Sequence, residues 1–132
     1  MKSFSVQTDG RDALIDITGK VQETVSEIGL KDGMVIVFVP HTTAGITINE
    51  NADPDVTADI KAALDKVVPW RAGYKHGEGN SAAHVKASMM GSSVTVIIAD
   101  GHLQLGTWQA IYFCEFDGPR NRRIWIKAIS QQ

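Results

Sequence analysis

The chain has 132 residues, of which 43% are hydrophobic and 21% are charged, and its formal net charge is −2. These values are typical of one globular domain over residues 1–132, and they argue against a general nucleic-acid binder, which needs a clear basic excess. The sequence contains neither an apolar run of eighteen residues nor an apolar leader, so we expect no membrane-spanning helix and no secretory signal.

Two strands and a helix are predicted in the first thirty residues. Residues 3–8 and 13–18 favour strands joined by a turn over residues 9–12, which has the composition Asp-Gly-Arg-Asp. Thr18 is suited to cap a helix that ends at Gly29, because glycine commonly follows the last helical residue. Apolar residues at spacings of four and three predict the core face of this helix: Val21, Val25 and Ile28.

The middle of the chain predicts two further strands and a second helix. The unbroken apolar run at residues 34–39 is typical of a buried strand, and residues 44–49 favour another strand. Asp53 before Pro54 is a strong helix start, because the carboxylate accepts free N–H groups and proline suits the first turn. Pro69 ends this helix, whose predicted apolar face is Val56, Ile60, Leu64 and Val67.

The last part of the chain predicts a short helix and three strands. A glycine-rich segment, 70–80, precedes a short helix over residues 81–90 that Asn80 or Ser81 can cap. The predicted strands are 93–99, 107–117 and 122–129. We expect the last two to pair as a hairpin. This order of elements predicts an α+β fold in which two longer helices and one short helix cover a mostly antiparallel sheet.

Three groups of polar residues lie at predicted strand ends, loops or helix starts, where binding sites are usually built. The first group contains His41, Asn49, Glu50 and Asp53. The second group contains His76, Asn80, His84, Lys86 and Ser88. The third group contains Gln109, Glu115, Asp117, Arg120, Arg122 and Arg123.

The histidines and carboxylates of these groups can hold a divalent metal. Imidazole suits zinc, whereas carboxylates alone suit magnesium, so the predicted ligands are His41, His76, His84, Glu50 and Asp53. Their spacing matches no known zinc motif. Each histidine therefore also has a structural interpretation, as a surface group or a satisfied hydrogen-bonding group. Asp53 has the alternative role of a helix cap.

The arginines and the single cysteine each have two interpretations. Arg120, Arg122 and Arg123 can bind a phosphate or carboxylate, or they can form salt bridges within the expected hairpin. Cys114 lies in an apolar strand without a neighbouring histidine, which favours a buried structural thiol over a nucleophile. One cysteine allows no internal disulfide, so we expect a reducing, cytoplasmic location.

The chain resembles the YjbQ family, an uncharacterised protein family also called secondary thiamine-phosphate synthase. The resemblance rests on His41-Thr42-Thr43-Ala44-Gly45 and on five further segments that cover nearly the whole chain in order. These segments are 49–54, 76–80, 84–88, 101–109 and 115–120.

The resemblance implies a compact α+β domain with a β-sandwich-like core, which assembles as a homotrimer with pockets near subunit contacts. It implies a thiamine phosphate synthase-like transferase, which joins a pyrimidine diphosphate to a thiazole phosphate and releases pyrophosphate. We assign catalytic roles to His41, Glu50, His76 and His84, and expect magnesium or zinc as a possible cofactor. The predicted substrate- or phosphate-binding residues are Thr42, Thr43, Asn49, Asn80, Lys86, Ser88, Gln109, Arg120 and Arg122.

Two alternatives from other functional classes stay open. One is a metal-dependent hydrolase or lyase that acts on a small phosphorylated or carboxylated metabolite, which the histidines and carboxylates favour. The other is a non-enzymatic, trimeric ligand-binding protein. Each interpretation predicts a small-molecule ligand, with no nucleic-acid or membrane partner.

Overall fold

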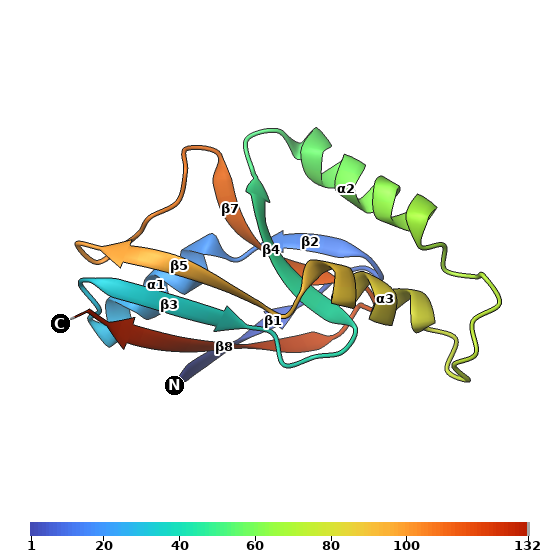
Figure 1. The fold of residues 1–132 in the computed structure, drawn as a ribbon, viewed down its shortest axis with the longest axis horizontal. Coiled ribbons are helices and arrows are strands. Elements are labelled where there is room, and N and C mark those ends of the chain that lie inside the picture. Colours follow the sequence, from blue (N-terminus) through green and yellow to red (C-terminus); the bar gives the residue numbers. More distant parts are fainter. Residues whose placement is uncertain (132) are drawn as a thin grey trace.

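Strands and helices are mixed along the chain, as expected of an α+β fold, and Figure 1 shows their arrangement. The computed structural model describes residues 1–131. The strands are β1 (Lys2–Gln7), β2 (Ala13–Asp16), β3 (Gly33–Phe38), β4 (Ala44–Glu50), β5 (Ser93–Ala99), β6 (His102–Leu103), β7 (Gln109–Glu115) and β8 (Asn121–Ser130). The helices are α1 (Thr18–Ile28), α2 (Pro54–Val67) and α3 (Ser81–Met90). Within this part of the chain no helix is long and apolar enough to cross a membrane.

The strands form two antiparallel sheets with a shared core. One sheet has the order β1-β8-β3-β5-β6, and the other has the order β2-β7-β4. Val35 and Val37 of β3 pack in the same cluster as Ile46 of β4 and Phe113 of β7, and Val25 of α1 joins them. These five side chains exclude solvent almost completely, which confirms the expectation of a sandwich-like α+β domain.

The larger sheet is apolar on both faces, but only its inner face is covered. The run at residues 34–39 was expected to be buried on both sides. In the structure Val35 and Val37 are buried, whereas their neighbours point outward. The outer face carries side chains that are 37–66% exposed: Phe38, Trp125, Met34, Ile129 and Ile97. Phe38 and Trp125 stack there with their ring centroids 5.7 Å apart.

The predicted hairpin between the last two long strands is wrong. β7 pairs with β2 and β4, whereas β8 pairs with β1 and β3 in the other sheet. The segment between them crosses from sheet to sheet because it is hydrogen-bonded to the β1–β2 connection: the Gly118 N–H donates to the Arg11 carbonyl, and the Arg120 N–H donates to the Thr8 hydroxyl. The crossing places residues 117–120 at the junction of the sheets.

The helix caps are predicted correctly in part. Asp53 caps α2, because its carboxylate accepts the Asp55 N–H at 2.9 Å, and Gly29 ends α1 in the left-handed conformation. Thr18 does not cap α1; its hydroxyl accepts the Ile111 N–H and so ties the helix to β7. Val67 is 69% exposed instead of lying in the core, because the buried contact of α2 is made by Leu64, one turn earlier.

Candidate functional site

An open pocket lies between α3 and the chain segment that leads into β4. Figure 1 shows β4 and α3 side by side at this end of the strand. Its volume is about 500 Å³, which suits a small metabolite. Four of the predicted site residues line it: His41, Thr42, His84 and Ser88. The other lining residues are Ala44, Ala87, Gly91 and Ser92. The imidazoles and hydroxyls can both donate and accept hydrogen bonds.

The close approach of α3 to β4 depends on Gly45. A Cβ atom at this position would lie 2.8 Å from the Gly91 carbonyl oxygen and 2.9 Å from the Met90 Cβ. The Ile46 N–H donates to the same Gly91 oxygen at 3.1 Å, and the Val39 N–H donates to the Ser92 oxygen at 2.7 Å. These contacts fix one wall of the pocket. Ser92 was missed from the sequence, since only the packing of distant segments brings it to the site.

His41 is held by the backbone of β8. Its Nε2 atom accepts the Arg123 N–H at 2.9 Å. Burial lowers the pKa of His41 below its ordinary value of 6.5, and the nearby positive charge of Arg122 lowers it further. His41 is therefore neutral at physiological pH. The structure supports a specific role for this residue rather than that of a loosely solvated surface histidine.

Arg122 lies beside His41, but its charge is already paired. Its guanidinium donates to both carboxylate oxygens of Glu115, at 2.8 and 2.5 Å, and to the Thr43 hydroxyl at 2.8 Å. Burial alone would raise the pKa of Glu115, but hydrogen bonds from Arg122, the Asp117 backbone and Thr8 outweigh burial and lower it. Arg122 is 3% exposed and Thr43 is 5% exposed, so neither side chain faces the pocket. Both were predicted to bind substrate or phosphate, and the structure gives them a structural position instead.

Lys86 is also withdrawn from the pocket. Its side chain is fully buried, and its ammonium group donates to Asp12 at 2.7 Å and to Asp65. The hydrogen bond from Lys86 lowers the pKa of Asp65. The ammonium also lies 5.8 Å from the centre of the Phe116 ring. This ion cluster joins α3 to α2 and to the β1–β2 connection, so the structure gives Lys86 a structural position in place of the predicted phosphate-binding one.

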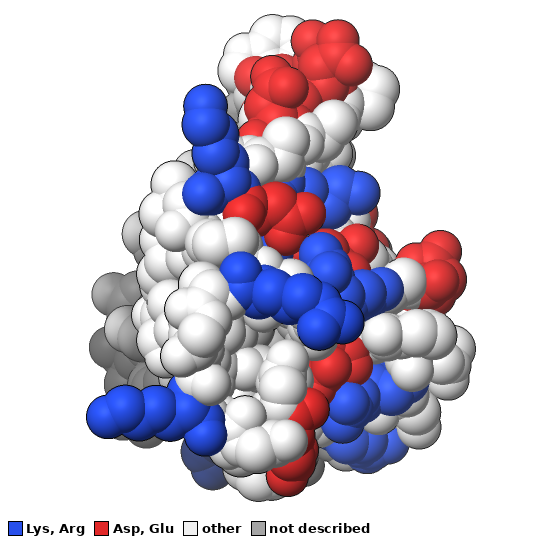
Figure 2. Space-filling model, turned by 90° about the vertical axis from the view of Figure 1, so that its right-hand side faces the viewer, with Lys and Arg blue, Asp and Glu red and all other residues white. Residues whose placement is uncertain are grey.

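A second polar group lies at the start of α3. The rings of His76 and His84 meet edge to face with centroids 5.4 Å apart. Asn80 donates to the Asp117 carboxylate at 2.9 Å, and Arg120 donates to the same oxygen at 3.2 Å. Figure 2, which views this end of the molecule, shows basic side chains across the middle of the face with acidic side chains beside them. The charges are therefore interspersed rather than gathered in one basic surface.

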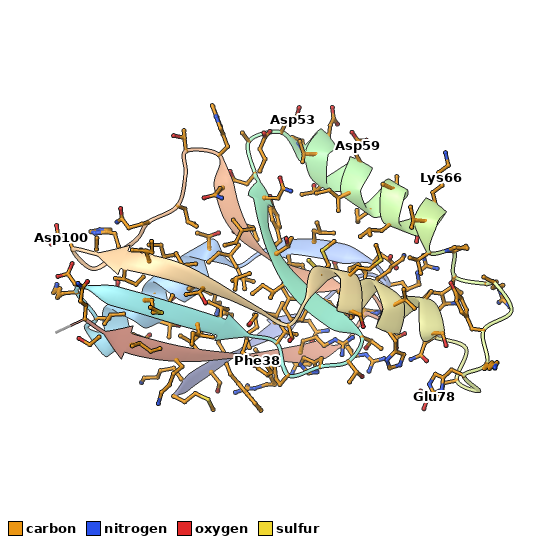
Figure 3. All side chains as sticks on the ribbon, viewed as in Figure 1. Phe38, Asp53, Asp59, Lys66, Glu78 and Asp100 are labelled. Atoms are coloured by element: carbon orange, nitrogen blue, oxygen red, sulfur yellow. The ribbon has the colours of Figure 1, made fainter. Side chains whose placement is uncertain are left out.

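The remaining predicted residues lie at the opposite end of β4. Ala44 pairs with Glu115 at one end of the strand, and Glu50 pairs with Gln109 at the other, six residues and roughly 20 Å away. Figure 3 agrees with this separation: Phe38, at the end of β3, is labelled at the bottom of the view, and Asp53, before α2, is labelled at the top. One chain therefore does not bring Asn49, Glu50, Asp53 or Gln109 to the histidines.

The predicted metal ligands consequently do not form a complete site within one chain. Across residues 1–131 no three side chains of histidine, cysteine, aspartate or glutamate lie close enough to share a metal ion. Glu50 and Asp53 are distant from the histidines, and the Nε2 lone pair of His41 is occupied. His76 and His84 are the one predicted pair in mutual contact. A metal cofactor thus stays a prediction.

Comparison with known proteins places this arrangement in a family. Residues 2–131 match the family described as UPF0047 protein YjbQ-like. The UPF0047 protein YugU of Bacillus subtilis is 52% identical over 128 residues, which are 96% of this chain and 97% of YugU. The UPF0047 protein MJ1081 of Methanocaldococcus jannaschii is 50% identical over 129 residues, which are 98% of this chain and 94% of that protein.

Solved structures agree with the sequence comparison. A crystal structure of an uncharacterised YjbQ/UPF0047 protein from Clostridium acetobutylicum is 60% identical, has a TM-score of 0.96, and covers 98% of this chain and 100% of that one. A hypothetical protein from Aeropyrum pernix is 37% identical, with a TM-score of 0.93 and 98% of each chain covered. Since the match spans residues 2–131 and the relatives are similar over nearly their full lengths, the chain belongs to the YjbQ (UPF0047) family.

Proposed function

We propose that the protein is a thiamine phosphate synthase-like transferase, which joins a pyrimidine diphosphate to a thiazole phosphate and releases pyrophosphate. The observation that supports this proposal best is the pocket that gathers His41, His84, Thr42 and Ser88 in a hollow of about 500 Å³. Such a pocket suits a small polar metabolite. The reaction type comes from the family resemblance.

In this reaction the bond between the pyrimidinylmethyl carbon and the diphosphate oxygen breaks, and the thiazole nitrogen forms a new bond to that carbon. The electron pair leaves with pyrophosphate, so hydrogen-bond donors near the leaving oxygens lower the barrier. His41 and the Thr42 hydroxyl are candidates for these donors, whereas the Ser88 hydroxyl already donates to the His84 carbonyl at 3.0 Å. Of the three cationic residues predicted to bind phosphate, Arg120 is half exposed, whereas Arg122 and Lys86 are buried in ion pairs.

We propose that the enzyme is a homotrimer whose site is completed at subunit contacts. The outer face of the larger sheet, with Phe38, Trp125 and Ile97 exposed, supports an interface, because apolar patches of this kind usually mark contacts. Glu50 and Gln109 lie far from the pocket of their own chain. In this proposal a neighbouring subunit supplies the metal ligands or charges that one chain lacks.

The assay supplies purified protein with both phosphorylated precursors and Mg²⁺ and follows the release of pyrophosphate. We expect His41→Ala to lower the rate about 100-fold, as is usual when a group that acts on the reacting bond is removed. Arg120→Ala is expected to lower it as well, whereas the exposed Lys2→Ala serves as a control. A rate that neither His41→Ala nor Arg120→Ala changes would contradict the proposal.

A metal-dependent hydrolase or lyase is the second candidate, and the contact between His76 and His84 favours it. Elemental analysis of protein purified without a histidine tag tests this function. It is rejected if the protein contains no stoichiometric metal and binds none on titration. Binding of precursors without turnover of any metabolite would instead favour the non-enzymatic ligand-binding trimer.

A further inference from the structure

The hydrogen bond between Arg123 and His41 determines which ring nitrogen of His41 carries the proton. A backbone N–H can only donate, so the Nε2 atom that receives it at 2.9 Å must present its lone pair. In a neutral imidazole the proton then lies on Nδ1. Among residues 1–131 no hydrogen bond engages Nδ1. His41 lines the pocket and carries a free N–H donor.

The buried pair of Arg122 and Glu115 holds both chain segments that meet at His41. Arg122 immediately precedes Arg123, whose N–H binds the ring. The Arg122 side chain also donates to the carbonyl and hydroxyl oxygens of Thr43, two residues after His41. The fixed position of one guanidinium therefore sets the distance between the imidazole and the N–H that it accepts.

This geometry disfavours His41 as a metal ligand. A metal ion at Nε2 would have to displace the Arg123 N–H and leave it without a partner. A metal ion at Nδ1 would require the loss of the Nδ1 proton, and the ring would then be an anionic imidazolate. The neutral donor form suits a different task, because it can bind an oxygen atom without first exchanging a proton with solvent.

We propose that His41 binds a phosphate or diphosphate oxygen of the substrate through its Nδ1–H, as a neutral donor, and that Arg122 and Glu115 are positioning residues that maintain this tautomer. The phosphorylated nature of the ligand rests on the proposed function, whereas the tautomer does not. Arg120 and Arg122 lie near enough to influence His41 electrostatically, and the charge of Glu115 opposes them, so the case for an oxygen acceptor rests on the free Nδ1–H rather than on net positive charge.

The tautomer is measured directly in ligand-free protein labelled with ¹⁵N-histidine. Long-range ¹H–¹⁵N spectra distinguish the two neutral forms and the imidazolium, and His41→Ala identifies the resonances of His41. We expect the Nδ1–H form at pH 7, and a shift of the Nδ1 resonance when pyrophosphate is added. The Nε2–H form, an imidazolium at pH 7, or no response to pyrophosphate would each overturn the proposal.

Two substitutions separate the roles of the two nitrogens. His41→Asn places an amide N–H near the position of Nδ1, whereas His41→Gln places a carbonyl near Nε2 and can still accept the Arg123 N–H. We expect the Asn variant to bind pyrophosphate about tenfold more tightly than the Gln variant, the value of one hydrogen bond to a charged acceptor. Equal affinities, or tighter binding by the Gln variant, would overturn the donor role.

The positioning role is tested with Glu115→Gln, which weakens the pair with Arg122. We expect a mixture of His41 tautomers in this variant, whereas a merely structural role would lower stability without changing the tautomer. If Glu115→Gln does not fold, Thr43→Val removes one Arg122 contact and Thr43→Ser restores it, so the same readout applies. Should the synthase assay fail while the tautomer and pyrophosphate results hold, the proposed reaction is wrong and the donor role stands.

Discussion

Glu115 lies at the centre of a buried polar cluster. Its carboxylate accepts hydrogen bonds from Arg122, from Thr8 and from the Phe116 and Asp117 backbone. Both partners of the ion pair are almost inaccessible to water, so neither charge can be solvated if the other is lost. At the residue scale, this explains why Arg122 serves the fold around His41 rather than a ligand.

Lowering the pH is expected to destabilise the protein through Glu115. Its pKa is below the ordinary 4.5 in the folded protein, so the stabilisation is fully present above pH 4.5 and is lost as the pH falls through the folded value. Urea unfolding at a series of pH values between 3 and 7 measures this effect. Glu115→Gln should flatten the acidic part of the profile, and an unchanged slope in that variant would assign the effect to other carboxylates.

Cys114 is expected to be unreactive in the folded protein. Burial raises the pKa of its thiol to about 12, and the thiolate is the reactive form. A disulfide-exchange reagent at pH 8 should therefore modify Cys114 far more slowly in native protein than in urea-unfolded protein. Rapid reaction in the native state would show that β7 opens to solvent or that the thiol is exposed.

The position of α3 is decided by two contacts on opposite sides of the helix. Gly45 allows its C-terminal turn to approach β4, and Lys86 joins its middle to Asp12 and Asp65. Since His84 and Ser88 project from this helix into the pocket, the geometry of the site depends on both contacts. At the element scale, α3 is thus a structural support for the pocket as well as part of its wall.

Gly45→Ala is expected to destabilise the protein by about 1–3 kcal/mol, because the added methyl group has no space against Gly91 and Met90. Gly19→Ala is the matched control, since a Cβ atom at this position in α1 meets nothing within 4 Å. That change should stabilise by about 0.5–1 kcal/mol. Urea unfolding of both variants gives the comparison, and equal effects would show that the approach of α3 can adjust.

Lys86→Met should lower the free energy of unfolding, whereas pyrophosphate affinity should change only as far as α3 moves, because Lys86 is fully buried and does not line the pocket. The loss of the ammonium leaves Asp12 without its buried partner, at a cost of about 1–3 kcal/mol; Asp65 is partly solvated and limits the cost. Isothermal titration calorimetry measures the affinity alongside urea unfolding. Unchanged stability with weakened pyrophosphate binding would restore Lys86 as a phosphate ligand.

Local patterns in the sequence were sufficient for most helices and strands but not for their assembly. The Asp53-Pro54 start of α2 and the existence of the β3 strand depend on neighbouring residues, and both were predicted, although the exposure of one face of β3 was not. The partners of β8 and of Lys86 depend on residues far along the chain, such as Asp12, which is 74 positions from Lys86. Their positions in the sequence could indicate His41 and His84 as candidate site residues. Only the approach of α3 to β4 shows that they share a pocket.

At the scale of the whole molecule, the notable feature is the outer face of the larger sheet, whose apolar side chains no other part of the described chain covers. Ile97 is 66% exposed within this apolar face, whereas Val67 is equally exposed, at 69%, on the separate surface of α2. If the sheet face forms the contacts of the expected homotrimer, a charge at Ile97 is buried without a partner in the assembly, whereas a charge at Val67 stays in water.

We therefore expect the protein to have three times the 14.3 kDa mass of one chain in light scattering coupled to size-exclusion chromatography. Ile97→Glu should shift this mass towards that of the single chain, and Val67→Glu should leave it unchanged. A trimer that persists in Ile97→Glu would show that the interface lies on another surface. Dissociation could abolish pyrophosphate release while the Nδ1–H tautomer of His41 is retained. That result would mean that the reaction requires groups from a neighbouring subunit, whereas the tautomer of His41 is set within one chain.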